Sequence, residues 1–74
     1  MENNAELEIE KSYSKQDAIA ALRRLADALE QSTTFEIFLE GVRVFVPPEA
    51  TVEFEYERVA DQQELEIELK WTHS

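Results

Sequence analysis

Carboxylates are the side chains of this sequence with the greatest capacity for chemistry. Seventeen of its 74 residues are Asp or Glu, and many alternate with apolar residues, as in ELEIELKW at 64–71. Clustered carboxylates bind hard cations such as calcium. Two carboxyl groups about 5 to 10 Å apart across a cleft can also hydrolyse a glycoside as an acid and base pair. Cation binding requires the carboxylates to converge on one point, and hydrolysis requires them to face each other across a cleft.

The sequence predicts neither of these arrangements. There is no looped Asp/Asn/Gly pattern of a calcium site, and side chains on a flat sheet face diverge from one another. No apolar pocket is evident that would raise a carboxyl pKa. His73 stands alone near the C-terminus, and the absence of cysteine excludes disulfides and thiolate metal sites. We therefore expect no enzyme, no cofactor and no specific metal site, only diffuse counterion binding.

The net charge of −10 makes binding to negatively charged partners unfavourable. Repulsion disfavours phosphate backbones and anionic lipid surfaces, so we expect neither a nucleic acid nor a membrane partner. No basic and apolar leader opens the chain, and no apolar run approaches the roughly 18 residues of a membrane span. We expect a cytoplasmic protein, a monomer or weak homodimer, whose favoured partner is a basic protein.

Hydrophobic periodicity predicts one helix among five strands. Alternation over 6–13 predicts a first strand; Ser14 and Asp17 then form a helix N-cap, so the helix begins at Lys15. Residues 35–39 and 42–46 flank Gly41 as a hairpin. After Pro47 and Pro48, the segments 51–57 and 64–71 form a second hairpin. The larger apolar stripe of the helix comprises Ala18, Ile19, Leu22, Leu25, Ala26 and Leu29.

These elements predict an α+β fold, with the amphipathic helix packed on one face of a mostly antiparallel sheet of about five strands. The chain order is strand, helix and four more strands. Residues 1–5 are expected to form a loose tail and 6–74 a single domain. Trp71 shares the inner parity of the last strand and is expected to cap the core. Eleven glutamates fall on the outer parity, at positions 6, 8, 10, 36, 40, 53, 55, 57, 64, 66 and 68.

Phe38 and Phe45 depart from this pattern because they lie on the acidic outer parity. A turn on Gly41 and Val42 would place them opposite each other, whereas a turn on Glu40 and Gly41 would pair Phe38 with Arg43. The two rings either stabilise the hairpin or form the centre of an interface with a charged rim. The interface candidates are Phe38, Phe45, Glu36, Glu40, Arg43, Glu53 and Glu55.

Three functional hypotheses follow from these features. The favoured one is a small protein-interaction or accessory module that docks a basic partner on the outer face around Phe38 and Phe45. The second is a cation-responsive acidic protein without a dedicated partner. The third is a homodimer that buries the two phenylalanines against a second copy, with the negative rims interleaved with Arg43 and Arg58.

The order of these segments resembles the small prokaryotic amphi-Trp domain family. The resemblance rests on the early Glu-rich strand, the helix SKQDAIAALRRLADALE, the run VFVPPEATVEFEYE and the closing ELEIELKW with Trp71. It covers about residues 6–71. The resemblance implies a compact α+β domain with a tryptophan near the C-terminus, and it implies no catalytic residue.

Overall fold

The chain forms one helix and four strands in a computed structural model that describes residues 6–72. Their bounds are α1 Lys15–Gln31, β1 Phe35–Leu39, β2 Val42–Val46, β3 Thr51–Val59 and β4 Gln62–Lys70. The α+β class is therefore confirmed. The predicted tail at 1–5 and His73 lie outside the described residues.

The helix begins where its capping residues predicted. The hydroxyl of Ser14 accepts a hydrogen bond from the backbone N–H of Asp17 at 3.1 Å, which satisfies one of the free donors of the first turn. At the other end, Ser32 adopts a left-handed conformation with φ 56°, and the N–H of Thr33 donates to the carbonyl of Ala28 at 3.0 Å. Both ends of α1 are thus closed by local hydrogen bonds.

The first hairpin turns on Glu40 and Gly41, the second of the two predicted registers. Both central residues have positive φ, 49° and 82°, as a type I′ turn requires. The register places Phe38 opposite Arg43, and Glu36 opposite Phe45. Phe38 and Phe45 are therefore diagonal neighbours on one face and not a directly opposed pair.

The predicted single sheet is wrong, because the strands form two separate two-stranded antiparallel sheets, β1–β2 and β3–β4. The break lies at Pro47 and Pro48, which have no N–H to donate to a neighbouring strand. A turn follows, in which the N–H of Ala50 donates to the carbonyl of Pro47 at 3.1 Å. The turn redirects the chain, so β3 leaves β2 and pairs only with β4.

The predicted first strand is also absent, since residues 6–14 have no regular secondary structure. Alternation describes which face a strand would present, but a strand also needs a neighbour for its backbone groups. No strand of the described residues pairs with this segment. Its three glutamates, at positions 6, 8 and 10, also repel one another. They would be repelled again by the glutamates of the two hairpins if this segment paired with either sheet as a strand.

The core lies between α1 and the inner face of β1–β2. Its buried residues are Ala28, Phe35 and Val46, and Leu25 and Leu69 are among the half-buried residues packed against them. Together α1, β1 and β2 are termed the body. This core is small, because the helix covers two short strands instead of five.

The stripe that the helix turns toward the sheet overlaps the predicted one only at Ala18 and Leu25. Its more covered residues are small apart from one leucine, and comprise Ala18, Ala21, Leu25 and Ala28. Ile19, Leu22 and Leu29 remain 44%, 50% and 41% exposed. These three residues, termed the side stripe, lie about a quarter turn around the helix from the covered ones. A two-stranded sheet is too narrow to cover both.

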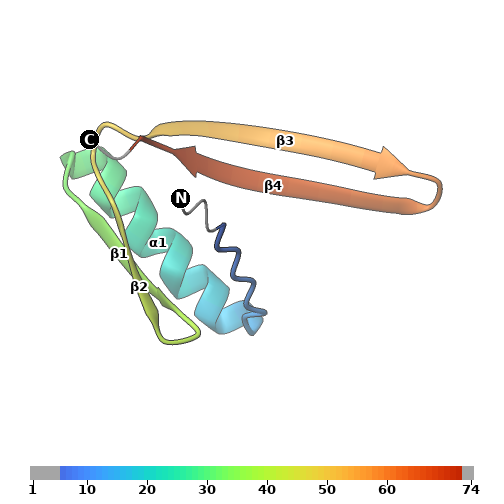
Figure 1. The fold of residues 1–74 in the computed structure, drawn as a ribbon, viewed down its shortest axis with the longest axis horizontal. Coiled ribbons are helices and arrows are strands. Elements are labelled where there is room, and N and C mark those ends of the chain that lie inside the picture. The colour runs from blue at the N-terminus through green and yellow to red at the C-terminus, as the bar shows by residue number, and fades with distance from the viewer. Residues whose placement is uncertain (1–5, 73–74) are drawn as a thin grey trace, which may run out of the picture.

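The β3–β4 hairpin, termed the arm, extends away from the body (Figure 1). Every residue of β3 is exposed. The radius of gyration is 14.4 Å, whereas a compact domain of this length has about 11.3 Å. The arm therefore has almost no contact with the rest of its own chain.

Candidate interaction surface

The outer face of β1–β2 carries the two phenylalanines that the sequence singled out. Alternation along each strand turns Phe35 and Ile37 toward α1, and this forces Phe38 outward. Phe38 and Phe45 are 51% and 53% exposed. Two aromatic rings thus lie diagonally on the face opposite the helix.

Arg43 links this aromatic pair to the acidic rim. Its guanidinium carbon lies 5.2 Å from the centroid of the Phe38 ring, in cation–π geometry, and its Nε lies 2.9 Å from Glu36 Oε2 in an ion pair. Both partners of the ion pair are about half exposed, so the pair contributes roughly 0.2 to 1 kcal/mol. The register places Glu36 and Arg43 on the diagonal that crosses the one joining the two phenylalanines, so the ion pair lies between the two rings.

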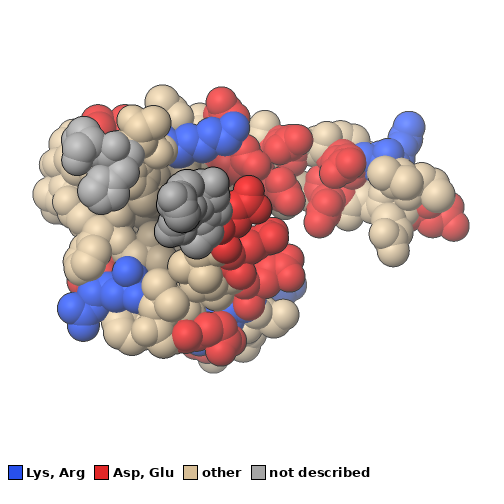
Figure 2. All heavy atoms as spheres, in the orientation of Figure 1, with Lys and Arg blue, Asp and Glu red and all other residues tan. Residues whose placement is uncertain are grey.

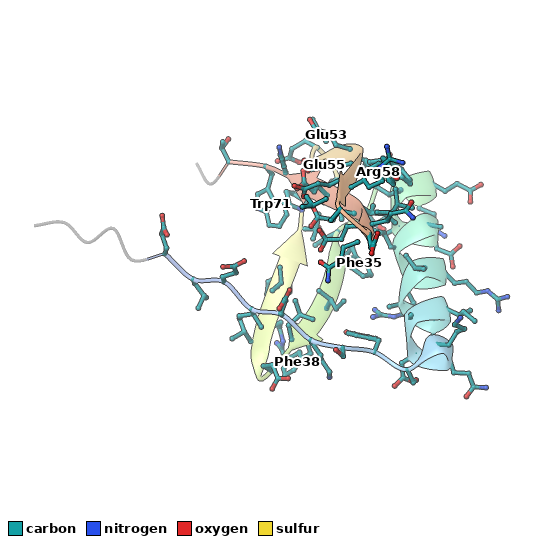
Figure 3. The ribbon with its side chains drawn as sticks, turned by 90° about the vertical axis from the view of Figure 1, so that its right-hand side faces the viewer. Phe35, Phe38, Glu53, Glu55, Arg58 and Trp71 are labelled. Carbon is teal, nitrogen blue, oxygen red and sulfur yellow. The ribbon has the colours of Figure 1, made fainter. Side chains whose placement is uncertain are left out.

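The predicted rim is only partly assembled. Glu40 occupies the turn of the same hairpin, whereas Glu53 and Glu55 lie on β3, in the other sheet. Figure 3 shows Phe38 at one end of the body and the two arm glutamates beyond the other end. The structure therefore groups five of the seven candidates and separates Glu53 and Glu55 from them.

The arm has an apolar face that the sequence pattern indicated but assigned to the core. Cross-strand pairing joins Val52 to Leu69, Phe54 to Ile67 and Tyr56 to Leu65. Phe54 and Leu65 are 69% and 68% exposed. The exposed side chains Val52, Phe54, Tyr56, Leu65 and Ile67 are termed the arm face. Leu69, at the base of the arm, is half-buried and packs against the core.

The opposite face of the arm is a ladder of glutamates. Its directly opposed pairs are Glu53 with Glu68, Glu55 with Glu66, and Glu57 with Glu64. Acidic side chains accordingly line the arm in Figure 2. The charge of Glu64 is the main cause that raises the pKa of Glu66 above its ordinary value of 4.5, with smaller contributions from desolvation and the other glutamates. Like charges placed opposite each other destabilise this hairpin.

Within this ladder, carboxylate oxygens of Glu55, Glu66 and Glu68 lie within 4.8 Å of one another. Three such oxygens can attract a hard cation, but calcium takes six to eight oxygen ligands. The cluster lies on an open sheet face, where water would have to supply the rest. The geometry is that of counterion attraction.

Lys70 offsets the acid charge at the base of the arm. Its Nζ lies 3.2 Å from Glu53 Oε1 and 3.5 Å from Glu68 Oε1. The hydrogen bond with Glu53, followed by the charges of Glu53 and Glu68, raises the pKa of Lys70 above its ordinary value of 10.5. The repulsion is therefore relieved at the base and remains around Glu66.

Trp71 is not part of the buried core, so its predicted role as a core cap is wrong. It follows β4 and is 38% exposed. It lines an open hollow at the base of the arm together with Glu49, Thr51 and Leu69, and Figure 3 shows it beside the junction with the body. Trp71 lies just beyond the end of β4, so it borders the junction with the body without entering the core.

The helix, the two hairpins and the terminal tryptophan occur in the order on which the family resemblance was based. The sequence model of the Amphi-Trp domain matches residues 1–74, which is the whole chain. The chain belongs to the Amphi-Trp domain family. No curated protein and no solved structure matches it. In this Amphi-Trp domain, no helix within residues 6–72 has the length and apolar character needed to cross a membrane.

Proposed function

We propose that this Amphi-Trp domain is a non-enzymatic protein-interaction module that docks a basic partner on the outer face of β1–β2. The observation that carries the proposal is the half-exposed pair Phe38 and Phe45, with the Glu36–Arg43 ion pair between the rings and Glu40 at the turn. Exposed aromatic rings beside charged groups are typical of protein interfaces. The net charge of −10 attracts a basic protein from a distance.

The contact of Arg43 with Glu36 suits this role. A basic side chain of the partner can replace Arg43 at the Glu36 carboxylate, and the released guanidinium remains over the Phe38 ring. After the exchange the Glu36 carboxylate is paired with the partner, and the Arg43 guanidinium keeps its cation–π contact with Phe38. Because the pair is exposed and weak, breaking it costs little.

The absence of buried ionisable groups supports a non-enzymatic role. Among residues 6–72 no charged or polar residue is buried. The groups with shifted pKa, Glu66 and Lys70, lie on the exposed arm. Catalytic acids and bases are usually tuned by burial in a cleft, which neither residue has. The acidic composition and lack of cysteine favour a cytoplasmic location as part of the proposal.

Affinity capture from a lysate of the native source would identify the partner. The baits are the wild type, a Phe38→Thr, Phe45→Thr double variant, and a Val59→Thr control. Threonine preserves both the charge and the β-propensity, and Val59 is an exposed apolar residue on the acidic face of the arm. The proposal predicts that a basic protein binds to the wild type and the control only.

Calorimetry with that purified partner then measures the affinity. We expect the double variant to bind at least about tenfold more weakly, and added salt to weaken wild-type binding. Equal capture by all three baits, or binding that is indifferent to salt, would refute docking at this face.

The second candidate is a cation-responsive protein, favoured by the convergence of Glu55, Glu66 and Glu68. A calcium titration followed by NMR distinguishes it from the first. Saturable shifts confined to these three residues would support a cation response, and uniform small shifts along the arm would indicate charge screening alone.

A further inference from the structure

Two apolar surfaces of the chain have no partner within the described residues. One is the arm face and the other is the side stripe of α1, and the arm makes no substantial contact with the helix of its own chain. We infer that the domain forms a twofold homodimer in which the arm face of each copy packs on the side stripe of the other. This inference concerns surfaces distinct from the outer face of β1–β2 and does not depend on the proposed function.

The exposed area matches the requirement of such a dimer. The chain exposes 6639 Å², about 1,900 Å² more than a compact monomer of its mass. This excess belongs to the whole chain, including residues 6–14, so about 3,800 Å² is the upper limit of what a pair could bury. Half of this limit still reaches the size of a standard stable interface, roughly 1,600 Å².

The two surfaces also match in length. A nine-residue strand spans about 30 Å, and the 17 residues of α1 span about 25 Å. The arm can therefore cover the whole helix. A helix on one face of a twisted antiparallel sheet is a stable two-layer arrangement, and here the sheet comes from another chain.

Charge favours the helix over a second arm as the partner surface. Residues 51–70 contain seven acidic and two basic side chains, whereas α1 contains three of each. Stacking two arms would bring two strongly negative hairpins together. Placing each arm on a neutral helix leaves its glutamate ladder in water.

The exchange of arms would stabilise both the arm and the body, which are each weakly stabilised in a single chain. An isolated two-stranded hairpin is marginally stable in water, and this one carries three opposed glutamate pairs. The body, in turn, has only three buried residues. A twofold exchange satisfies both surfaces in both copies, as a self-complementary interface requires.

Sedimentation equilibrium of variants that carry a charged residue on one of the two surfaces tests this arrangement. We expect the wild type to have twice the chain mass of 8.6 kDa. Phe54→Lys on the arm face and Leu22→Glu on the side stripe should each be monomeric, with dimer affinity reduced about a hundredfold or more. Mixed together they should form a heterodimer, which has one wild-type contact and one Lys–Glu contact.

Three controls make the result specific. Val59→Lys adds the same charge on the opposite face of the arm and should remain dimeric. The Phe38→Thr, Phe45→Thr variant should also remain dimeric, which separates this inference from docking at the outer face. If circular dichroism shows that Leu22→Glu has lost the helix, Ile19→Glu replaces it.

The opposite results would overturn the inference. A monomeric wild type excludes the dimer, and a dimeric Phe54→Lys variant excludes the arm face. A mixture that stays monomeric excludes the pairing of arm with helix. If the double phenylalanine variant or Val59→Lys is monomeric, the interface lies elsewhere on the chain.

Discussion

The two hairpins of this domain share an alternating apolar and polar pattern but have different surroundings. Both alternate apolar and polar residues, yet the inner face of β1–β2 packs on α1, whereas the apolar face of the arm is exposed. The difference arises at Pro47 and Pro48, after which the chain turns away from the helix. Alternation therefore determines that a face is apolar, and the connection determines what can cover it.

The same comparison applies to charge. On the outer face of the body, Arg43 interrupts the glutamates and pairs with Glu36 at 2.9 Å. On the arm, glutamate lies directly opposite glutamate at three positions, and only Lys70 offsets them, at the base. The body hairpin is thus stabilised by its charges and the arm is destabilised by them.

The largest expected effect tests the core of the body. Phe35→Ala removes a buried ring between α1 and β1 and should lower the free energy of unfolding by about 3 kcal/mol. Urea denaturation followed by circular dichroism measures this loss. Val59→Ala at the exposed arm tip is the control and should change stability by less than about 0.5 kcal/mol. Similar losses for the two variants would contradict the assignment of the core.

The turn of the body gives the next largest effect. Gly41 has φ 82°, which an L-residue adopts only with strain, while the space around its Cα is open. Gly41→Ala should therefore cost about 1 kcal/mol through the backbone alone. The midpoint of urea unfolding measures it. An unchanged midpoint would show that the hairpin does not turn on Glu40 and Gly41.

The turn of the arm should respond in the opposite direction. Ala60 has φ 54°, so its Cβ is strained where glycine would not be. Ala60→Gly relieves this strain at the expense of a more flexible unfolded chain and should stabilise the arm by about 0.5 kcal/mol. Increased protection of arm amides from hydrogen exchange would confirm it. A loss of protection would contradict the turn geometry.

The smallest effect is the response of the arm to pH. The pKa of Glu66 is raised in the folded arm, so the folded state binds its proton more tightly than the unfolded state does. Stability should therefore rise as the pH falls from 7 toward the ordinary glutamate pKa of 4.5. Thermal unfolding at several pH values measures this rise, and Glu66→Gln should reduce it.

Moderate salt should likewise raise the melting temperature at pH 7, because it screens the glutamate ladder. The pKa of Lys70 is also raised, so its contribution is lost only at a pH above about 10. The titration of Lys70 therefore does not contribute to the change of stability expected between pH 7 and 4.5. A melting temperature indifferent to both salt and pH would remove the premise of repulsion along the arm.

Local structure followed from the sequence where neighbouring residues determine it. Ser14 and Asp17 predicted the start of the helix, and Gly41 predicted the first hairpin. These features depend on hydrogen bonds and dihedral preferences within a few residues. The exposed pair Phe38 and Phe45 was found for the same reason, since parity alone places them outside.

Long-range structure did not follow, because alternation does not specify a strand's neighbour. Residues 6–13 have the pattern of a strand and no strand beside them, and the arm has the pattern of a core hairpin and no helix on it. The same ambiguity misplaced Glu53 and Glu55 in the rim and Trp71 in the core. In each case the face was right and the surroundings were wrong.

Hydrogen exchange of arm and body amides at a series of protein concentrations tests the central claim most directly. If a second copy covers the arm, the amides of β3 and β4 should be protected at high concentration and lose protection on dilution before those of α1, β1 and β2. Protection of the arm that is independent of concentration would contradict the account, because the arm would then be stable without a second chain.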